Sequence, residues 1–234
     1  MDFLVEVAAW FNDRANWRGE TGVANLAVEH LWICVVAMAL AATLALPLGL
    51  VLGHLGRGGV VAVNVSNAGR ALPSFAVLVL ALQLSSIGTT PALVALVALA
   101  VPPMVTNGYV GIREVDAELK EAALGMGMTG RQLFLAVELP VALPLVMAGV
   151  RTAAVQVVGT ATLAALVGYG GLGALVLLGL RTGDTVEVFA GALAVAFLAL
   201  VTELGLGRVQ RALAPGPGPR PRPQRVRFVD DRGG

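Results

Sequence analysis

The stretch that decides the fold covers residues 113–140, REVDAELKEAALGMGMTGRQLFLAVELP, and separates long apolar runs on either side. It is rich in Ala, Leu and Glu, which favour helices, and it carries charges of both signs. Charged residues are costly inside a bilayer, so this segment must lie at the membrane surface. The sequence therefore predicts a helical docking surface for a cytoplasmic partner.

The composition places the rest of the chain in a membrane. Hydrophobic residues make up 57% of the 234 residues, charged residues 13%, and the mean hydropathy is +0.81. These values lie outside the usual range of water-soluble domains. The apolar runs suit helices of about 20 residues and lack the alternation of membrane β-strands. We expect an all-α, polytopic membrane protein with about five transmembrane helices.

The predicted spans cover residues 30–52, 71–87, 92–112, 141–167 and 186–206. With the N-terminus outside, the inner segments hold twelve Lys and Arg and the outer segments three. The positive-inside rule then predicts an outer N-terminus and an inner C-terminus in the plasma (inner) membrane. A sixth crossing by residues 172–180 is too short and would place the arginine-rich C-terminus outside. That piece is expected to be interfacial or re-entrant.

Three regions follow from this pattern. Residues 1–29, with Trp10, Phe11 and Trp17, are expected to form an interfacial segment. Residues 30–213 form the transmembrane domain. Residues 214–234 are rich in Pro, Gly and Arg and predict a disordered cytoplasmic tail, either attracted to anionic membrane lipid or simply solvated.

Local signals predict a helix-turn-helix elbow within residues 113–140. Asp116 is placed to cap a first helix, and Gly125 or Gly127 to end it in a left-handed conformation. Thr129 and Gln132 have the spacing of a capping box at the start of a second helix.

The second helix is expected to end at Leu139–Pro140, because proline disfavours helical geometry in the residue before it. We expect Ala122 and Ala123 at the exposed end of the elbow, where small side chains permit close approach of a partner. Glu121 offers a carboxylate there. An ordinary charged loop would explain the acidic residues but not the Ala-Ala and Gly spacing.

This spacing resembles the signature of the membrane subunits of binding-protein-dependent ABC importers. The matching residues are Glu121, Ala122, Ala123, Gly127, Val137, Leu139 and Pro140. The one departure is Val137, where the family more often has Ile. Over about residues 70–175 the chain looks like permeases of glycine betaine, choline and carnitine (osmoprotectant) importers. The resemblance implies a type I importer permease fold like that of the methionine-importer membrane domain.

The resemblance also implies partners. The elbow would couple to a dimer of cytoplasmic ATPase subunits, beside a second permease subunit, identical or paralogous, and an external solute-binding protein. No nucleic-acid partner is expected. The only lysine, Lys120, does not stand in a phosphate-binding GxxxxGK[ST] loop, so the chain has no such nucleotide site of its own and is not expected to be an enzyme.

Other candidate residues have competing interpretations. Arg151 falls within a predicted span, which indicates either a role in the transport pathway or a structural pair, with Glu203 as the possible partner. Residues 168–173, GYGGLG, match the dinucleotide pattern GxGxxG but lack its strand and helix context. A tight turn at the outer mouth of the pathway is favoured.

No cofactor, metal or catalytic site is predicted. His30 and His54 flank the first span without metal-ligand spacing and are expected to be interfacial and structural. Cys34 is a lone packing residue.

The fourth span carries a small-residue pair, Gly149 and Ala153, and a polar stripe. The stripe consists of Thr152, Gln156, Thr160 and Thr162. These residues indicate either close packing on a neighbouring helix or a face toward the pathway.

The solute itself cannot be assigned from the spans. Quaternary ammonium ligands favour aromatic cages, and Trp10, Trp17 and Trp32 all lie near the N-terminus. Selection is therefore expected in the solute-binding protein. Alternative functions are an importer for another small solute, such as an amino acid, a membrane scaffold without transport, and an intramembrane enzyme, for which no facing nucleophile and base are found.

Overall fold

The computed structural model describes residues 2–60, 64, 73–85 and 87–213, and every regular element in this part is helical. The predicted tail, residues 214–234, lies outside it. Backbone polar groups in hydrocarbon must bond within their own segment, which is why apolar runs of this length form helices.

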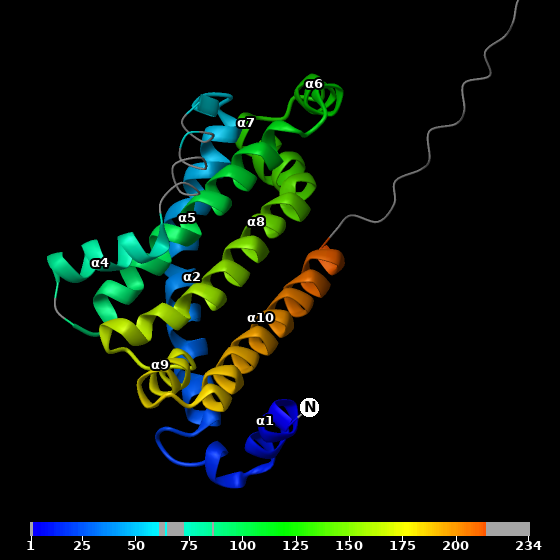
Figure 1. Cartoon of the computed structure of the whole chain (residues 1–234). Coiled ribbons are helices and arrows are strands. Elements are labelled where there is room, and N and C mark those ends of the chain that lie inside the picture. Colours follow the sequence, from blue (N-terminus) through cyan, green and yellow to red (C-terminus); the bar gives the residue numbers. More distant parts are fainter. Residues whose placement is uncertain (1, 61–63, 65–72, 86, 214–234) are drawn as a thin grey trace, which may run out of the picture.

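Four helices of the described part are long and apolar enough to cross a membrane. They are α2 (Val23–His54), α5 (Thr89–Arg113), the continuous helix Gly130–Val167 that contains α8 (Leu139–Thr160), and α10 (Thr185–Leu213). At about 1.5 Å per residue, even α5 rises about 37 Å, more than a hydrocarbon core of about 30 Å. Figure 1 shows these helices side by side as an inclined bundle.

The helix boundaries differ from the predicted spans; the helix predicted to begin at residue 141 begins at Gly130, and α10 runs on to Leu213 instead of residue 206. The first transmembrane helix begins at Val23 instead of residue 30, inside the segment that was expected to be interfacial. The span predicted over residues 71–87 contains α4 (Ser74–Leu84), whose 11 residues rise only about 16 Å. Residues 71, 72 and 86 lie outside the described part.

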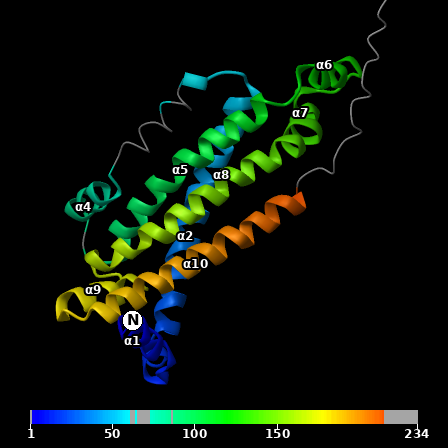
Figure 2. The same ribbon diagram turned by 45° about the vertical axis from the view of Figure 1, so that its right-hand side comes forward.

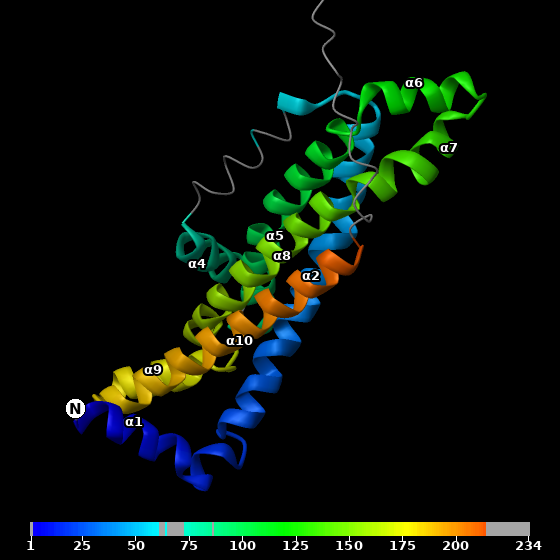
Figure 3. The same ribbon diagram turned by 90° about the vertical axis from the view of Figure 1, so that its right-hand side faces the viewer.

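Shorter elements lie at the two ends of the bundle. These are α1 (Asp2–Asn12), η1 (Arg14–Trp17), α6 (Ala117–Gly125), α7 (Gly130–Leu133), the π-helical turn η2 (Phe134–Glu138), the 3₁₀ helix η3 (Ala161–Val167) and α9 (Gly173–Thr182). Figures 2 and 3 place α6 and α7 at one end, and α1 and α9 at the other. The elbow therefore projects from the bundle end opposite the N-terminus.

A seam of small residues holds α2 against α5. Every fourth residue of α2 on this side is small and buried, namely Ala37, Ala41, Ala45, Gly49 and Gly53. A Cβ on Gly49 would lie 2.5 Å from the backbone oxygen of Val105, so the two helices touch through their backbones there. Small residues at such contacts drive helix association where lipid is as apolar as the side chains.

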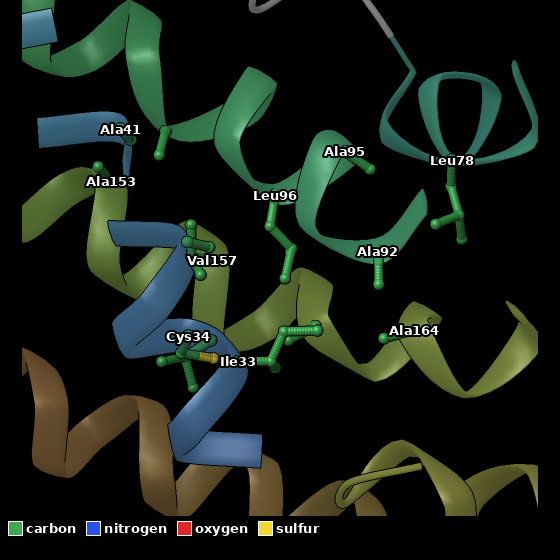
Figure 4. Close-up of a cluster of buried hydrophobic side chains, with 14 of the residues drawn as sticks. Ile33, Cys34, Ala41, Leu78, Ala92, Ala95, Leu96, Ala153, Val157 and Ala164 are labelled. Atoms are coloured by element: carbon green, nitrogen blue, oxygen red, sulfur yellow. The ribbon is translucent and has the colours of Figure 1, made fainter. Parts of the chain in front are cut away.

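The core continues from this seam into α8 and α4. Figure 4 shows Ile33 and Cys34 of α2, Leu96 of α5 and Val157 of α8 within one cluster, which Leu78 of α4 joins. Gly149 of α8 packs on α5, because a Cβ there would lie 2.6 Å from the Cβ of Asn107. α5 is thus covered by three helices, and α10 packs on the outer side of α8.

We expect Gly49→Ala to destabilise the subunit by about 1–3 kcal/mol, because the added methyl meets the backbone of α5 and neither helix can give way locally. The matched control is Gly205→Ala in α10, where a Cβ meets nothing within 4 Å. That variant should be neutral or gain up to about 1 kcal/mol of helix stability. Thermal unfolding midpoints in detergent compare the two; equal midpoints would contradict the seam.

Candidate functional site

The elbow, residues 113–140, begins with a tight turn after α5. The Asp116 carboxylate accepts a hydrogen bond of 2.9 Å from the backbone N–H of Glu118 and so caps α6, as predicted. Such a cap satisfies a donor that the first turn of a helix leaves free. The start of α6 is thereby fixed close to the end of α5.

Gly127 ends the first arm of the elbow. Its φ is +86°, while Gly125 is the last residue of α6. The N–H of Gly127 donates to the oxygen of Leu124, and that of Met128 to the oxygen of Ala123. This pair of bonds is a Schellman motif, which needs a left-handed residue at this place. Of the two predicted glycines, Gly127 therefore turns the chain.

A capping box starts the second arm. The Thr129 N–H donates to Gln132 Oε1 at 2.8 Å, and the Gln132 N–H donates to Thr129 Oγ1 at 3.4 Å. Both arms of the elbow thus have their end groups satisfied locally, as the sequence predicted. The connection between them, from Met126 to Met128, is short and fixed at each end.

The prediction that the second helix ends at Leu139–Pro140 is wrong. The helix runs on from Gly130 to Val167, through the π-helical turn η2. The N–H of Leu139 bonds to the oxygen of Phe134, five residues back. The wider turn leaves room for the ring of Pro140, which lacks an N–H and would clash in a regular helix. The elbow is therefore continuous with α8.

The signature residues divide between the surface and the interior. Glu121, Ala122 and Gly127 are exposed, and Pro140 is exposed at the start of α8. Ala123, predicted to be exposed, is only 2% exposed. Val137 and Leu139 are half-buried.

Apolar side chains are exposed beside the exposed signature residues. Leu124 is 50% exposed and Met126 is 74% exposed, both at the turn of the elbow. Figure 3 shows this turn at the far tip of the molecule. Exposed apolar groups beside a rigid backbone turn are typical of a protein-binding surface.

Three titratable side chains meet at the base of the elbow. Glu138, 2% exposed, lies with Oε2 2.5 Å from His54 Nδ1 and with Oε1 3.4 Å from Lys120 Nζ. Lys120 also donates to the oxygen of Ile112 at 2.9 Å. His54, expected to be a simple interfacial residue, instead contacts the elbow. This group of three side chains was not predicted from the sequence. The sequence shows only that His54, Lys120 and Glu138 all lie next to apolar runs, on the side of the membrane predicted to be the inner one.

Arg151 has the partner that the sequence suggested. Its guanidinium lies 2.8 Å from Glu203 Oε1 and donates to Gln210 Oε1 at 3.0 Å. The amide of Gln210 donates in turn to the oxygen of Pro144 at 2.9 Å. This chain of contacts joins α8 to α10 near the end of α10.

His30 is buried and is not interfacial as expected, because α2 begins at Val23 and places it two turns inside the helix. Its Nε2 lies 2.9 Å from the oxygen of Val158, so it links α2 to α8. Its Nδ1 has no hydrogen-bond partner in the described part of the chain.

The glycine-rich segment after η3 forms a turn beside α2. Gly168, Gly170 and Gly171 all have positive φ. The hydroxyl of Tyr169 donates to the backbone oxygen of Glu29 at 3.0 Å. Burial, with a smaller contribution from the charge of Glu29, raises the pKa of Tyr169 and keeps the phenol a donor. A helical neighbourhood of this kind does not form a dinucleotide site.

Only half of the predicted polar stripe faces away from the core, because Thr160 at the end of α8 and Thr162 in η3 are half-buried. Thr152 and Gln156 are exposed, whereas Gly149 and Ala153 are buried toward α5. The packing and surface interpretations thus apply to opposite faces of the same helix. Among the described residues, no group of three His, Cys, Asp or Glu side chains could hold a metal ion.

Comparison with known proteins identifies related chains. A family model described as a binding-protein-dependent transport system inner membrane component matches residues 45–217, which include the whole elbow. The glycine betaine/carnitine/choline transport system permease protein OpuCB of Bacillus subtilis is 37% identical over 187 residues, covering 80% of this chain and 86% of that protein. The osmoprotectant import permease protein OsmY of Salmonella typhimurium is 38% identical over 192 residues, covering 81% of each.

The fold also has a solved counterpart. An inward-facing structure of the MetNI methionine ABC transporter contains a chain that superposes with a TM-score of 0.70 at 25% identity. The match covers 80% of this chain and 94% of that chain. The arrangement of helices expected from the sequence is therefore confirmed at the level of the fold.

Reversing one charge of the Arg151–Glu203 pair should destabilise the subunit. We expect Glu203→Arg to lose about 1 kcal/mol, because two guanidinium groups then face each other between α8 and α10. The double variant Arg151→Glu with Glu203→Arg should recover most of this loss. Thermal unfolding in detergent measures all three proteins. A double variant as unstable as the single one would show that the pair does not join the helices.

Proposed function

The chain belongs to the family of binding-protein-dependent transport system inner membrane components, and from this membership we propose that a cytoplasmic ATPase docks on its elbow. The observation that carries the proposal is the elbow itself, capped at both arms and exposing Glu121, Ala122 and Gly127 at its tip. A surface that transmits force must keep its shape under load, and the local caps supply that rigidity.

Hydrolysis of ATP then belongs to the partner. The single lysine of the sequence, Lys120, lies beside Glu138 at the elbow base and belongs to no phosphate-binding loop. Closure of two ATPase subunits would push the docked elbows together and turn the helices between inward- and outward-facing arrangements.

The topology that fits this role places the elbow in the cytoplasm. The C-terminal ends of α2 and α10 lie toward the same side as the elbow, while α1 and α9 lie at the opposite end (Figure 1). An elbow inside the cell therefore gives an outer N-terminus and an inner C-terminus, in agreement with the distribution of Lys and Arg. The outer end would receive the solute-binding protein.

A second permease subunit, identical or paralogous, would cover the polar face of α8. Gln156 is exposed in a membrane span, and its side chain makes no hydrogen bond within the described part. A primary amide facing lipid would leave its polar groups unsatisfied, at a substantial free-energy cost. A dimer with a water-filled pathway between its subunits removes that cost.

The solute that we propose is an osmoprotectant of the glycine betaine, choline and carnitine type. This proposal rests on relatives that are 37–38% identical to this chain and whose names include these solutes. The quaternary ammonium group of such a solute is held by aromatic faces. Trp10 and Trp17 instead contact Phe11 in the N-terminal segment. Selection would then lie in the solute-binding protein.

An amino acid is the competing solute, and the methionine transporter that shares the fold is the observation in its favour. ATP-driven uptake into proteoliposomes separates the two solutes. Labelled glycine betaine or choline should accumulate with the matching binding protein and ATPase. Accumulation of an amino acid alone would retain the importer and replace the solute. No ATP-dependent flux of either kind would contradict the proposed function.

We expect Gly127→Asp to abolish uptake while the subunit still inserts into the membrane. A Cβ at Gly127 meets nothing within 4 Å, so the side chain points outward onto the docking surface. Gly183→Asp is a matched control, because Gly183 has φ +76° and equally open surroundings at the opposite end of the bundle. Co-purification of the ATPase compares the two variants, because the end of the bundle that carries Gly183 would receive the solute-binding protein; equal loss of the ATPase in both would show backbone strain instead of docking.

A further inference from the structure

A buried carboxylate connects the elbow to a helix that is not its neighbour in the chain. Glu138 lies in the π-helical turn between α7 and α8, and one of its oxygens meets His54 at the end of α2. The other oxygen faces Lys120 of α6. The two oxygens of one carboxylate thus contact two different elements.

The π-helical turn is what aims this side chain. One extra residue in a turn rotates everything after it by about 100° relative to a regular helix. Leu133 before the turn and Glu138 within it are both buried as a result. Such turns are rare and are frequent at functional sites. Here the turn directs a charged group into the interior at the point where the elbow becomes α8.

Chain connectivity alone would link the elbow only to α5 and α8. Arg113 ends α5 ahead of α6, and the second arm runs without a break into α8. α2 is not joined to the elbow through the chain, and the contact of His54 with Glu138 links the two instead. The ring of His54 also lies 5.1 Å from that of Phe134, so an aromatic contact accompanies the contact with Glu138.

We propose that Glu138 is a positioning residue that ties the elbow to α2, so that a push on the elbow moves α2 together with α5 and α8. The inference rests on the proposed function, since it needs an ATPase at the elbow. A buried carboxylate stays in place only while charged or hydrogen-bonded partners hold it. Loss of either partner would loosen the joint without changing the docking surface at the tip.

The test is the amount of solute imported per ATP hydrolysed, in proteoliposomes with the binding protein and ATPase. We expect Glu138→Gln to keep the ATPase bound and hydrolysing, but to lower this ratio by about tenfold, within the usual range of coupling between sites. A role confined to folding would lower hydrolysis and import together and leave the ratio unchanged.

Lys120→Met tests the same joint from the elbow side, and it serves as the second variant if Glu138→Gln fails to fold. Methionine keeps most of the length of the lysine side chain without its charge. Lys120→Met should lower the ratio as well, and the double variant should be no worse than Glu138→Gln alone, because that substitution already removes the ion pair that Lys120→Met removes. Lys120→Arg, which keeps the charge, should retain coupling. Glu187→Gln, at a half-buried acid of α10 at the opposite end of the bundle, is the control for a lost carboxylate.

The outcomes separate the two proposals. If the unmodified importer works and Glu138→Gln or Lys120→Met has the same ratio, the positioning role is overturned and the proposed function stands. If the unmodified protein shows no ATP-driven uptake with any solute, the proposed function fails and the role of Glu138 falls with it.

Discussion

Close backbone contact between α2 and α5 is the constraint on which the rest of the structure depends. In lipid there is little hydrophobic gain from burying one helix against another, so association relies on how closely the surfaces approach. The seam from Ala37 to Gly53 provides that approach along the C-terminal half of α2. Because α5 is held this way, its end at Arg113 has a fixed position, and so has the elbow that follows it.

Features of this chain that depend on interactions between nearby residues could be predicted from the sequence, and features that depend on distant residues could not. The caps at Asp116, Gly127 and Thr129 join residues at most a few positions apart, so spacing alone located them. The His54–Glu138 contact spans 84 residues and the contact of His30 with Val158 spans 128, which no local pattern encodes. The helix end predicted at Pro140 was wrong for a related reason, since the π-helical turn that accommodates this proline depends on tertiary context.

Arg151 shows an intermediate case. A charged residue within an apolar span demands a partner, and Glu203 was the acid at a comparable depth in another span. The need for a partner could be inferred from the sequence. The hydrogen bond from Arg151 to Gln210 could not, because it depends on how α10 packs on α8.

Polar contacts between helices in this bundle are few and lie where they fix direction. His30 links α2 to α8, Arg151 links α8 to α10, and Glu138 links the elbow to α2. A hydrogen bond or ion pair is directional and resists sliding of one helix along another. A seam of methyl and methylene groups is not directional and resists sliding less. Helices joined in this manner should move as one unit within a subunit. In the proposed dimer, alternation between two arrangements would then occur mainly between the subunits, at surfaces such as the exposed face of α8.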